Sequence, residues 1–276
     1  MKELFEVAAG TVVGRHHVRL GVNNQDGYYL TSTEEATIAI VCDGCSSGVH
    51  SEVGAKVGAR LVGEAIRRSL FEGEAIDEPE KCLELVRQNV LENIKTMAIA
   101  MGGNTNEIPP KILQHYFLFT IVGVWIARSG IVTFSLGDGL LIVNDRPTQI
   151  GPFANNAPPY LVYDFLDSNS DRWKFTIHDR LNLEDLNSIL IGTDGVNDLM
   201  KLAHCPFPGK PDLIGDIRQF WTQDRYFQNP DTIRRQLSLI NREIHKPNWE
   251  HRQMLKETGL LPDDTTLIVI RKRKSS

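Results

Sequence analysis

The chain has 276 residues, of which 41% are hydrophobic and 24% are charged, a composition typical of a globular protein. Its formal net charge of -5 argues against a nucleic-acid-binding protein, which needs clustered Lys and Arg to neutralise phosphates. No apolar run approaches the roughly 20 residues of a membrane span, and the N-terminus lacks the apolar core of a secretory signal. We therefore expect one soluble, cytoplasmic domain over residues 1–276, with a solvated basic tail at 271–276 and no membrane or nucleic-acid partner.

The first part of the chain predicts strands followed by helices. The runs Leu4 to Val13 and Thr37 to Cys42 are rich in β-forming residues, and the second is continuously apolar, as in a buried strand. Apolar residues then recur at helical spacing from Ser51 to Leu70 and from Pro79 to Ala100, where Pro79 suits the first turn of a helix.

The middle of the chain predicts an antiparallel meander after a loop over Gly102 to Pro110. Tyr116 to Ala127 and Ile131 to Leu136 are aromatic and β-branched runs joined by a short turn, which is typical of a hairpin. Leu140 to Val143 follows across Asp138-Gly139 as a further strand.

The last part of the chain predicts two strands, then two helices, then a final strand. The expected strands are Trp173 to Ile177, Ser188 to Gly192 and Thr265 to Ile270, and the expected helices are Pro211 to Trp221 and Asp231 to Lys246. Strands, then helices, then strands indicate an α+β fold in which helices cover antiparallel sheets.

Aspartates at the ends of strands are the most informative pattern. The dipeptide Asp-Gly occurs at residues 26, 43, 138 and 194, and the pair Asp263-Asp264 opens the last strand. Each Asp-Gly alone is a turn signal. Together, however, they could bring carboxylates to one edge of the sheets, where bound cations would offset their repulsion. Mg²⁺ and Mn²⁺ prefer such oxygen ligands, and two of these ions can activate water to attack a phosphate ester.

Five motifs in order resemble the metal-dependent type 2C Ser/Thr protein phosphatases. The motifs are Gly-x-x-His with Gln-Asp at residues 14–26, Ile-Val-Cys-Asp-Gly at 40–44, Gly-Asp-Gly at 137–139, Gly-Thr-Asp-Gly-Val-Asn-Asp at 192–198 and Asp-Asp-Thr-Thr-Leu at 263–267. The first of them is similar to a bacterial branch of the family. The resemblance implies an αββα sandwich of two antiparallel sheets flanked by helices. It also implies hydrolysis of phosphoserine and phosphothreonine in proteins, which would reverse the action of a Ser/Thr kinase.

The resemblance also implies roles for individual residues. It makes Asp43 a bridge between two Mg²⁺ or Mn²⁺ ions, with the Gly44 carbonyl, Asp194 and Asp264 as further ligands. Asp26 would anchor water around the ions, and Asp138 with Asp198 would hold a possible third ion.

Two positions depart from the family pattern. Gly21 stands where the family places an Arg that binds the substrate phosphate, so His17 or Arg19 is expected to take that role, with His17 preferred. Cys45 stands where many members have a His that is a proposed general acid. A water on a metal ion or His50 is left as the acid.

Other classes of protein fit the sequence less well. Cys42-x-x-Cys45 suggests a zinc or redox site, but Cys42 belongs to an apolar strand and no second Cys pair exists. No P-loop, dinucleotide-binding motif or Gly-x-Ser-x-Gly occurs. The alternative from another class is a catalytically weak phosphatase-like module that regulates or binds phosphoproteins, which has no chemical need to keep all of the aspartates.

Overall fold

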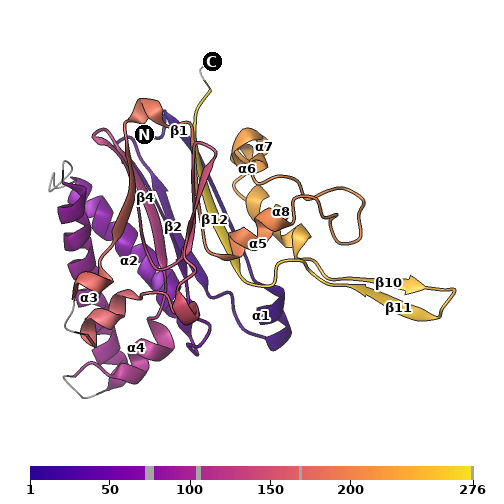
Figure 1. Ribbon diagram of the computed structural model, residues 1–276, viewed down its shortest axis with the longest axis horizontal. Helices are drawn as coiled ribbons and strands as arrows, with labels where there is room; N and C mark the ends of the chain where they lie inside the picture. Colours follow the sequence, from indigo (N-terminus) through magenta and orange to yellow (C-terminus); the bar gives the residue numbers. More distant parts are fainter. Residues whose placement is uncertain (72–77, 104–106, 168–169, 275–276) are drawn as a thin grey trace.

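The computed structural model describes residues 1–71, 78–103, 107–167 and 170–274. Two five-stranded antiparallel sheets lie face to face between two groups of helices (Figure 1). This arrangement confirms the predicted αββα sandwich.

The first sheet has the strand order β2-β3-β4-β5-β8. Its strands are β2 (Asp26–Ser32), β3 (Ala36–Asp43), β4 (Ile121–Ala127), β5 (Gly130–Leu136) and β8 (Thr176–Leu181). Strands β2 and β3 pair so that Asp26 lies opposite Asp43. The predicted hairpin of β4 and β5 is confirmed, with Ile121 opposite Leu136.

The second sheet has the strand order β1-β12-β9-β6-β7. Its strands are β1 (Phe5–Val12), β12 (Thr265–Lys272), β9 (Ser188–Gly192), β6 (Gly139–Val143) and β7 (Arg146–Ile150). The last strand of the chain therefore lies inside the sheet, between β1 and β9. This position explains why it is nearly all apolar.

The apolar strands are buried on both faces because each sheet has a partner on either side. In β3, Ile38 and Ile40 face the helices, whereas Ala39 and Val41 face the other sheet. Alternate residues of β12 likewise fall in different cores. Such continuous apolar runs are expected when neither face of a strand meets water.

Helices cover the outer face of each sheet. The helices α2 (Ser51–Phe71), α3 (Pro79–Gly102) and α4 (Pro110–Tyr116) lie on the side of the first sheet. The opposite group is α5 (Gly195–Lys201), α6 (Gln219–Thr222), α7 (Arg225–Gln228) and α8 (Thr232–Ile240). Short 3₁₀ turns, η1 to η4, occupy Ala154–Asn156, Leu161–Phe165, Ser170–Trp173 and Leu183–Asp185. Among the helices that the described ranges contain, none has the length and apolar character to cross a bilayer.

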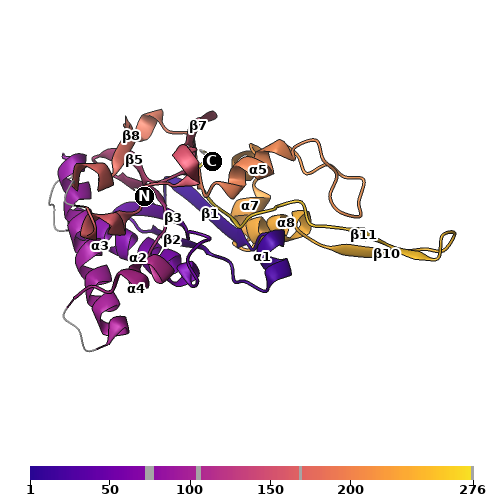
Figure 2. The same cartoon turned by 60° about the horizontal axis from the view of Figure 1, so that its bottom comes forward.

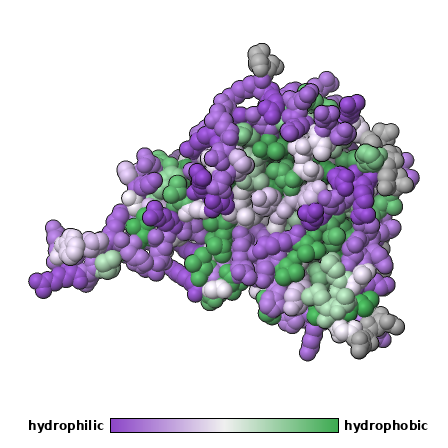
Figure 3. All heavy atoms as spheres, turned by 180° about the vertical axis from the view of Figure 1, so that it is seen from behind, coloured by the Kyte–Doolittle hydropathy of each residue, from purple (hydrophilic) through white to green (hydrophobic). Residues whose placement is uncertain are grey.

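A two-stranded hairpin of β10 (Ile244–Asn248) and β11 (Gln253–Glu257) projects from the body. The short helix α1 (Arg15–Leu20) lies beside its base in both ribbon views (Figure 2). A side-chain hydrogen bond of 3.1 Å from Arg15 to the Gly259 carbonyl joins α1 to the segment that follows β11. Seen from behind, the hairpin is mostly hydrophilic (Figure 3).

Several predicted elements are wrong. Strands β5 and β6 belong to different sheets, so Asp138-Gly139 is a crossing between sheets and not a hairpin turn. The predicted helix over Pro211 to Trp221 is mostly loop, and the one over Asp231 to Lys246 ends at Ile240. Helical spacing in short stretches does not distinguish a helix from a loop or strand whose apolar residues pack on the same core. The predicted loop over Gly102 to Pro110 lies partly outside the described residues.

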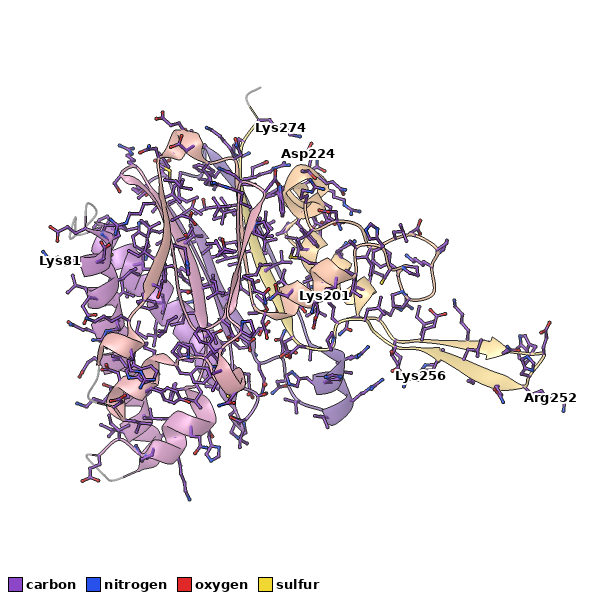
Figure 4. All side chains as sticks on the ribbon, viewed as in Figure 1. Lys81, Lys201, Asp224, Arg252, Lys256 and Lys274 are labelled. Carbon is purple, nitrogen blue, oxygen red and sulfur yellow. The ribbon has the colours of Figure 1, made fainter. Side chains whose placement is uncertain are left out.

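The predicted basic tail is wrong at its first residue. Arg271 belongs to β12 and is buried, because β12 continues its pairing with β1 beyond Ile270. Its guanidinium forms ion pairs with Glu6 at 2.6 Å and Asp224 at 2.9 Å. Lys274 lies beside Asp224 at 3.0 Å (Figure 4). The end of the chain is therefore held to the body of the protein as far as Lys274.

Candidate metal centre

Strand ends bring five aspartates to one edge of the sandwich. Asp26 begins β2, Asp43 ends β3, Asp138 lies at the crossing from β5 to β6, Asp194 follows β9, and Asp263 precedes β12. The hydroxyl of Thr193 donates to Oδ2 of Asp26 at 2.9 Å, which joins an element of the second sheet to one of the first. The topology thus explains why residues far apart in sequence meet here.

All of these aspartates except Asp26 line a cavity of about 90 Å³. Its lining residues are Gln25, Asp43, Gly44, Cys45, Ser46, Thr120, Asp138, Pro158, Tyr160, Asp194 and Asp263. Asp43, Gly44, Asp138 and Asp194 are predicted site residues that the structure places together in this cavity. Asp26 is buried and lies opposite Asp43 in the pairing of β2 with β3.

Burial and the nearby negative charges disfavour the ionised form of several of these carboxyl groups. Burial, followed by the charges of Asp26 and Asp194, raises the pKa of Asp43 well above its usual range. Burial and the charge of Asp264 do the same to the pKa of Asp26. Burial and the charge of Asp194 raise the pKa of Asp138 to about 6. None of the described residues that line the cavity is a lysine or arginine, so the negative charge has no cationic side chain beside it there.

Among the five aspartates at this edge, two have a buried carboxylate oxygen without a hydrogen-bond partner. These atoms are Oδ1 of Asp26 and Oδ1 of Asp194. Buried acceptors without partners are costly, and such atoms in an acidic cavity are typical of cation ligands. The aspartates offer only oxygen atoms as ligands, which fits a hard divalent ion such as Mg²⁺ or Mn²⁺.

Asp264, a predicted ligand, does not line the cavity. Its Oδ1 accepts a hydrogen bond from the Gly14 amide at 2.6 Å, and its Oδ2 accepts one from the Gln25 amide at 2.5 Å. Nδ1 of His17 lies 2.9 Å from Oδ2 of Asp264, without the alignment of a hydrogen bond. His17, Asp263 and Asp264 have ligand atoms within 4.8 Å of one another. Of the two adjacent aspartates, only Asp263 lines the cavity.

Three further predicted residues lie outside the cavity. Asp198 is on α5, where its carboxylate forms an ion pair with Lys201 at 2.8 Å. Arg19 is exposed on α1 and interacts electrostatically with Glu243. His50 is exposed and packs on the ring of Tyr116. Gly21, at the position of the family's Arg, ends α1 with a φ of 67°, a left-handed conformation that favours glycine.

Gly195 permits close contact between two of the cavity's segments. A Cβ atom at Gly195 would lie 2.1 Å from the backbone oxygen of Asp264. Asp194 and the segment that carries Asp263 can therefore approach only because residue 195 has no side chain.

Tyr160 is a cavity residue that the sequence analysis missed. Its side chain is buried, and its pKa is raised by burial and then by a hydrogen bond with Cys45, so the hydroxyl keeps its proton. It follows a Pro/Asn-rich stretch that carries no strand or helix signal. The Pro-Pro-Tyr sequence gives no indication of which part of the fold this loop meets.

Comparisons with known proteins agree with this geometry. The family model described as Protein phosphatase 2C matches residues 13–235. Among curated protein sequences, none matches the chain. The fold is similar to the crystal structure of a bacterial serine phosphatase, with 15% identity, a TM-score of 0.56 and 99% of each chain covered. A mutant form of a bacterial serine phosphatase gives 14% identity and a TM-score of 0.55, covering 98% of this chain and 99% of that one.

The match to the family model extends over more than half of the chain and includes four of the five motifs. The chain therefore belongs to the protein phosphatase 2C family, whose members are metal-dependent protein phosphatases.

Proposed function

We propose that the chain hydrolyses phosphoserine and phosphothreonine in proteins with two divalent cations, Mg²⁺ or Mn²⁺, held in the acidic cavity. The observation that carries this proposal is the group of converging carboxylates with raised pKa values and unpartnered buried oxygens. When bound, the cations would lower the pKa of a water molecule and neutralise charge on the phosphoryl group.

The ligands in this proposal are Asp43, the Gly44 carbonyl, Asp194 and Asp263. Asp43 and Asp194 are the central pair, since each lines the cavity and the charge of Asp194 is among the causes of the raised Asp43 pKa. Asp263 takes the place that the sequence analysis gave to Asp264, because Asp263 lines the cavity and Asp264 does not. Asp26 is held in position by the hydroxyl of Thr193 and would anchor water around the ions.

A third ion is a further part of the proposal. Asp138 lines the cavity, but Asp198 would first have to leave Lys201 in order to contribute. His17 and Arg19 stay predictions for contact with substrate, since neither lines the cavity. His17 meanwhile packs against Asp264 and positions the segment before β12.

The biological setting is also an inference. Phosphorylated proteins are the substrates that this activity requires, and a Ser/Thr kinase must supply them. A cytoplasmic location fits the four cysteines, all of which are free thiols. The net charge of -5 supports the expectation that nucleic acids are not substrates or partners.

Hydrolysis of a phosphothreonine peptide tests the proposal. Phosphate release is measured with Mn²⁺, with Mg²⁺ and with chelator, for the wild type, for Asp43→Asn, and for the exposed control Asp212→Asn. We expect metal-dependent release that falls roughly 100-fold or more in Asp43→Asn and is unchanged in the control. Equal rates in chelator would refute the role of metal. Absence of turnover with Mn²⁺ bound would indicate a regulatory or phosphoprotein-binding module.

A further inference from the structure

A second cavity, of about 390 Å³, adjoins the acidic cavity. The two cavities share two wall residues, Cys45 and Tyr160. The remaining lining residues are Ser47, Pro110, Leu113, Gln114, Leu118, Ala157, Val162, Tyr163 and Leu166. A group bound in the acidic cavity therefore has this second cavity as its direct neighbour.

The second cavity is uncharged and mostly apolar, in contrast to the first. In the part of the chain that the structure describes, no Asp, Glu, Lys, Arg or His lines it. Leu113, Leu118 and Val162 are buried in its walls, whereas Leu166 is 61% exposed. Exposed leucine beside a concave apolar surface is typical of a site that binds an apolar group.

The walls are held in place before any ligand arrives. The 3₁₀ turn η2, which carries Tyr163, is tied to α3 by an ion pair of 2.9 Å between Asp164 and Arg87. Arg87 is in turn fixed by two hydrogen bonds of 2.8 and 2.9 Å to Glu84. The ring of Tyr163 packs edge-on against Tyr160 at 5.4 Å and against Trp173 at 5.2 Å. A pocket with fixed walls loses little conformational entropy when it is filled.

We propose that this pocket binds a large apolar side chain of the substrate, within two residues of the phosphorylated Ser or Thr. The proposal rests on the proposed function, because the phosphorylated residue must occupy the acidic cavity. An extended peptide advances about 3.3 Å per residue, so side chains one or two positions away can enter a cavity that shares a wall with the first. The uncharged lining selects against Asp, Glu, Lys and Arg at that position, since a charge there would lose its hydration.

A peptide series tests the proposal. The reference is a phosphothreonine peptide with alanine at the two positions on either side, and the others carry leucine or aspartate at one of these four positions. We expect leucine at one position to raise kcat/KM about tenfold over alanine, and aspartate there to lower it. A leucine preference at none of the four positions, with normal hydrolysis of the alanine peptide, would overturn the pocket and leave the phosphatase function intact.

Two variants locate the preference in the pocket. Ala157→Trp places an indole in the lining, and Ala154→Trp makes the same change at an exposed alanine of the preceding 3₁₀ turn that does not line it. The ratio of leucine to alanine rates within each variant is the readout. We expect the ratio to fall to about one in Ala157→Trp and to persist in Ala154→Trp. Persistence in both variants would place the preference elsewhere and overturn the proposal.

Peptide binding tests the pocket even if the protein hydrolyses no peptide. If no peptide is hydrolysed, the proposed function fails, and fluorescence anisotropy of labelled peptides with Mn²⁺ then decides on the pocket alone. Leucine peptides that bind at least fivefold tighter than the alanine peptide support it, and equal binding overturns it.

Discussion

Asp138→Asn should stabilise the metal-free protein. Burial and the nearby charge of Asp194 raise the pKa of Asp138 from 3.8 to about 6, so the ionised form is disfavoured in the folded state. A pKa raised by about 2 corresponds to a cost of about 3 kcal/mol at neutral pH. Asp138 is partly exposed, and solvent screening reduces this cost to about 1–1.5 kcal/mol. Asparagine has nearly the same shape and avoids the cost.

The stability gained in Asp138→Asn should depend on pH. A carboxylate whose pKa is raised on folding binds more protons in the folded state, so stability declines as pH rises from 3.8 to about 6 and is level above that. The gain from Asp138→Asn should therefore be largest at pH 7.5 and fall to roughly a third at pH 4.5. Below both pKa values it should disappear.

Urea unfolding of the chelator-treated protein measures this gain. The free energy of unfolding is compared at pH 7.5 and pH 4.5 for the wild type, Asp138→Asn and the exposed control Asp212→Asn, which should match the wild type. A destabilised Asp138→Asn, or a gain that does not depend on pH, would refute the account of mutual repulsion in the cavity.

Two substitutions test other parts of the structure. Asp264→Ala leaves the buried amides of Gly14 and Gln25 without acceptors. It should therefore lower the free energy of unfolding by about 2–4 kcal/mol, measured in chelator. A variant of normal stability that no longer binds Mn²⁺ would instead make Asp264 a ligand. Gly54→Ala should destabilise by about 1–3 kcal/mol in thermal or urea unfolding, because its Cβ would lie 1.8 Å from the Tyr116 carbonyl oxygen, and wild-type stability would contradict that packing.

The sequence predicted the regular core of the fold well. The strands β3 and β12 are continuous apolar runs because helices cover one face and the second sheet the other, and this double burial is visible in the sequence. The hairpin of β10 and β11 was missed, since its strands are exposed and lack apolar alternation.

The candidate site was predictable in part. Asp-Gly motifs at strand ends located Asp43, Asp138 and Asp194, because topology brings strand ends together. The choice between Asp263 and Asp264 depends on which side chain points into the cavity, which a one-residue change of register reverses. Tyr160 could not be predicted, because its loop has no periodic pattern. The 3₁₀ turn that follows it is held by a contact between residues far apart in sequence, the ion pair of Asp164 with Arg87.

Electron paramagnetic resonance during a Mn²⁺ titration tests the central claim most directly. The account predicts that the wild type binds two Mn²⁺ ions close enough to show spin coupling, since the ions of two-metal sites lie roughly 4 Å apart. In Asp43→Asn the coupled signal should be lost, while Asp212→Asn keeps it. Uncoupled ions in the wild type, or a coupled signal that survives in Asp43→Asn, would contradict a two-metal centre built on Asp43.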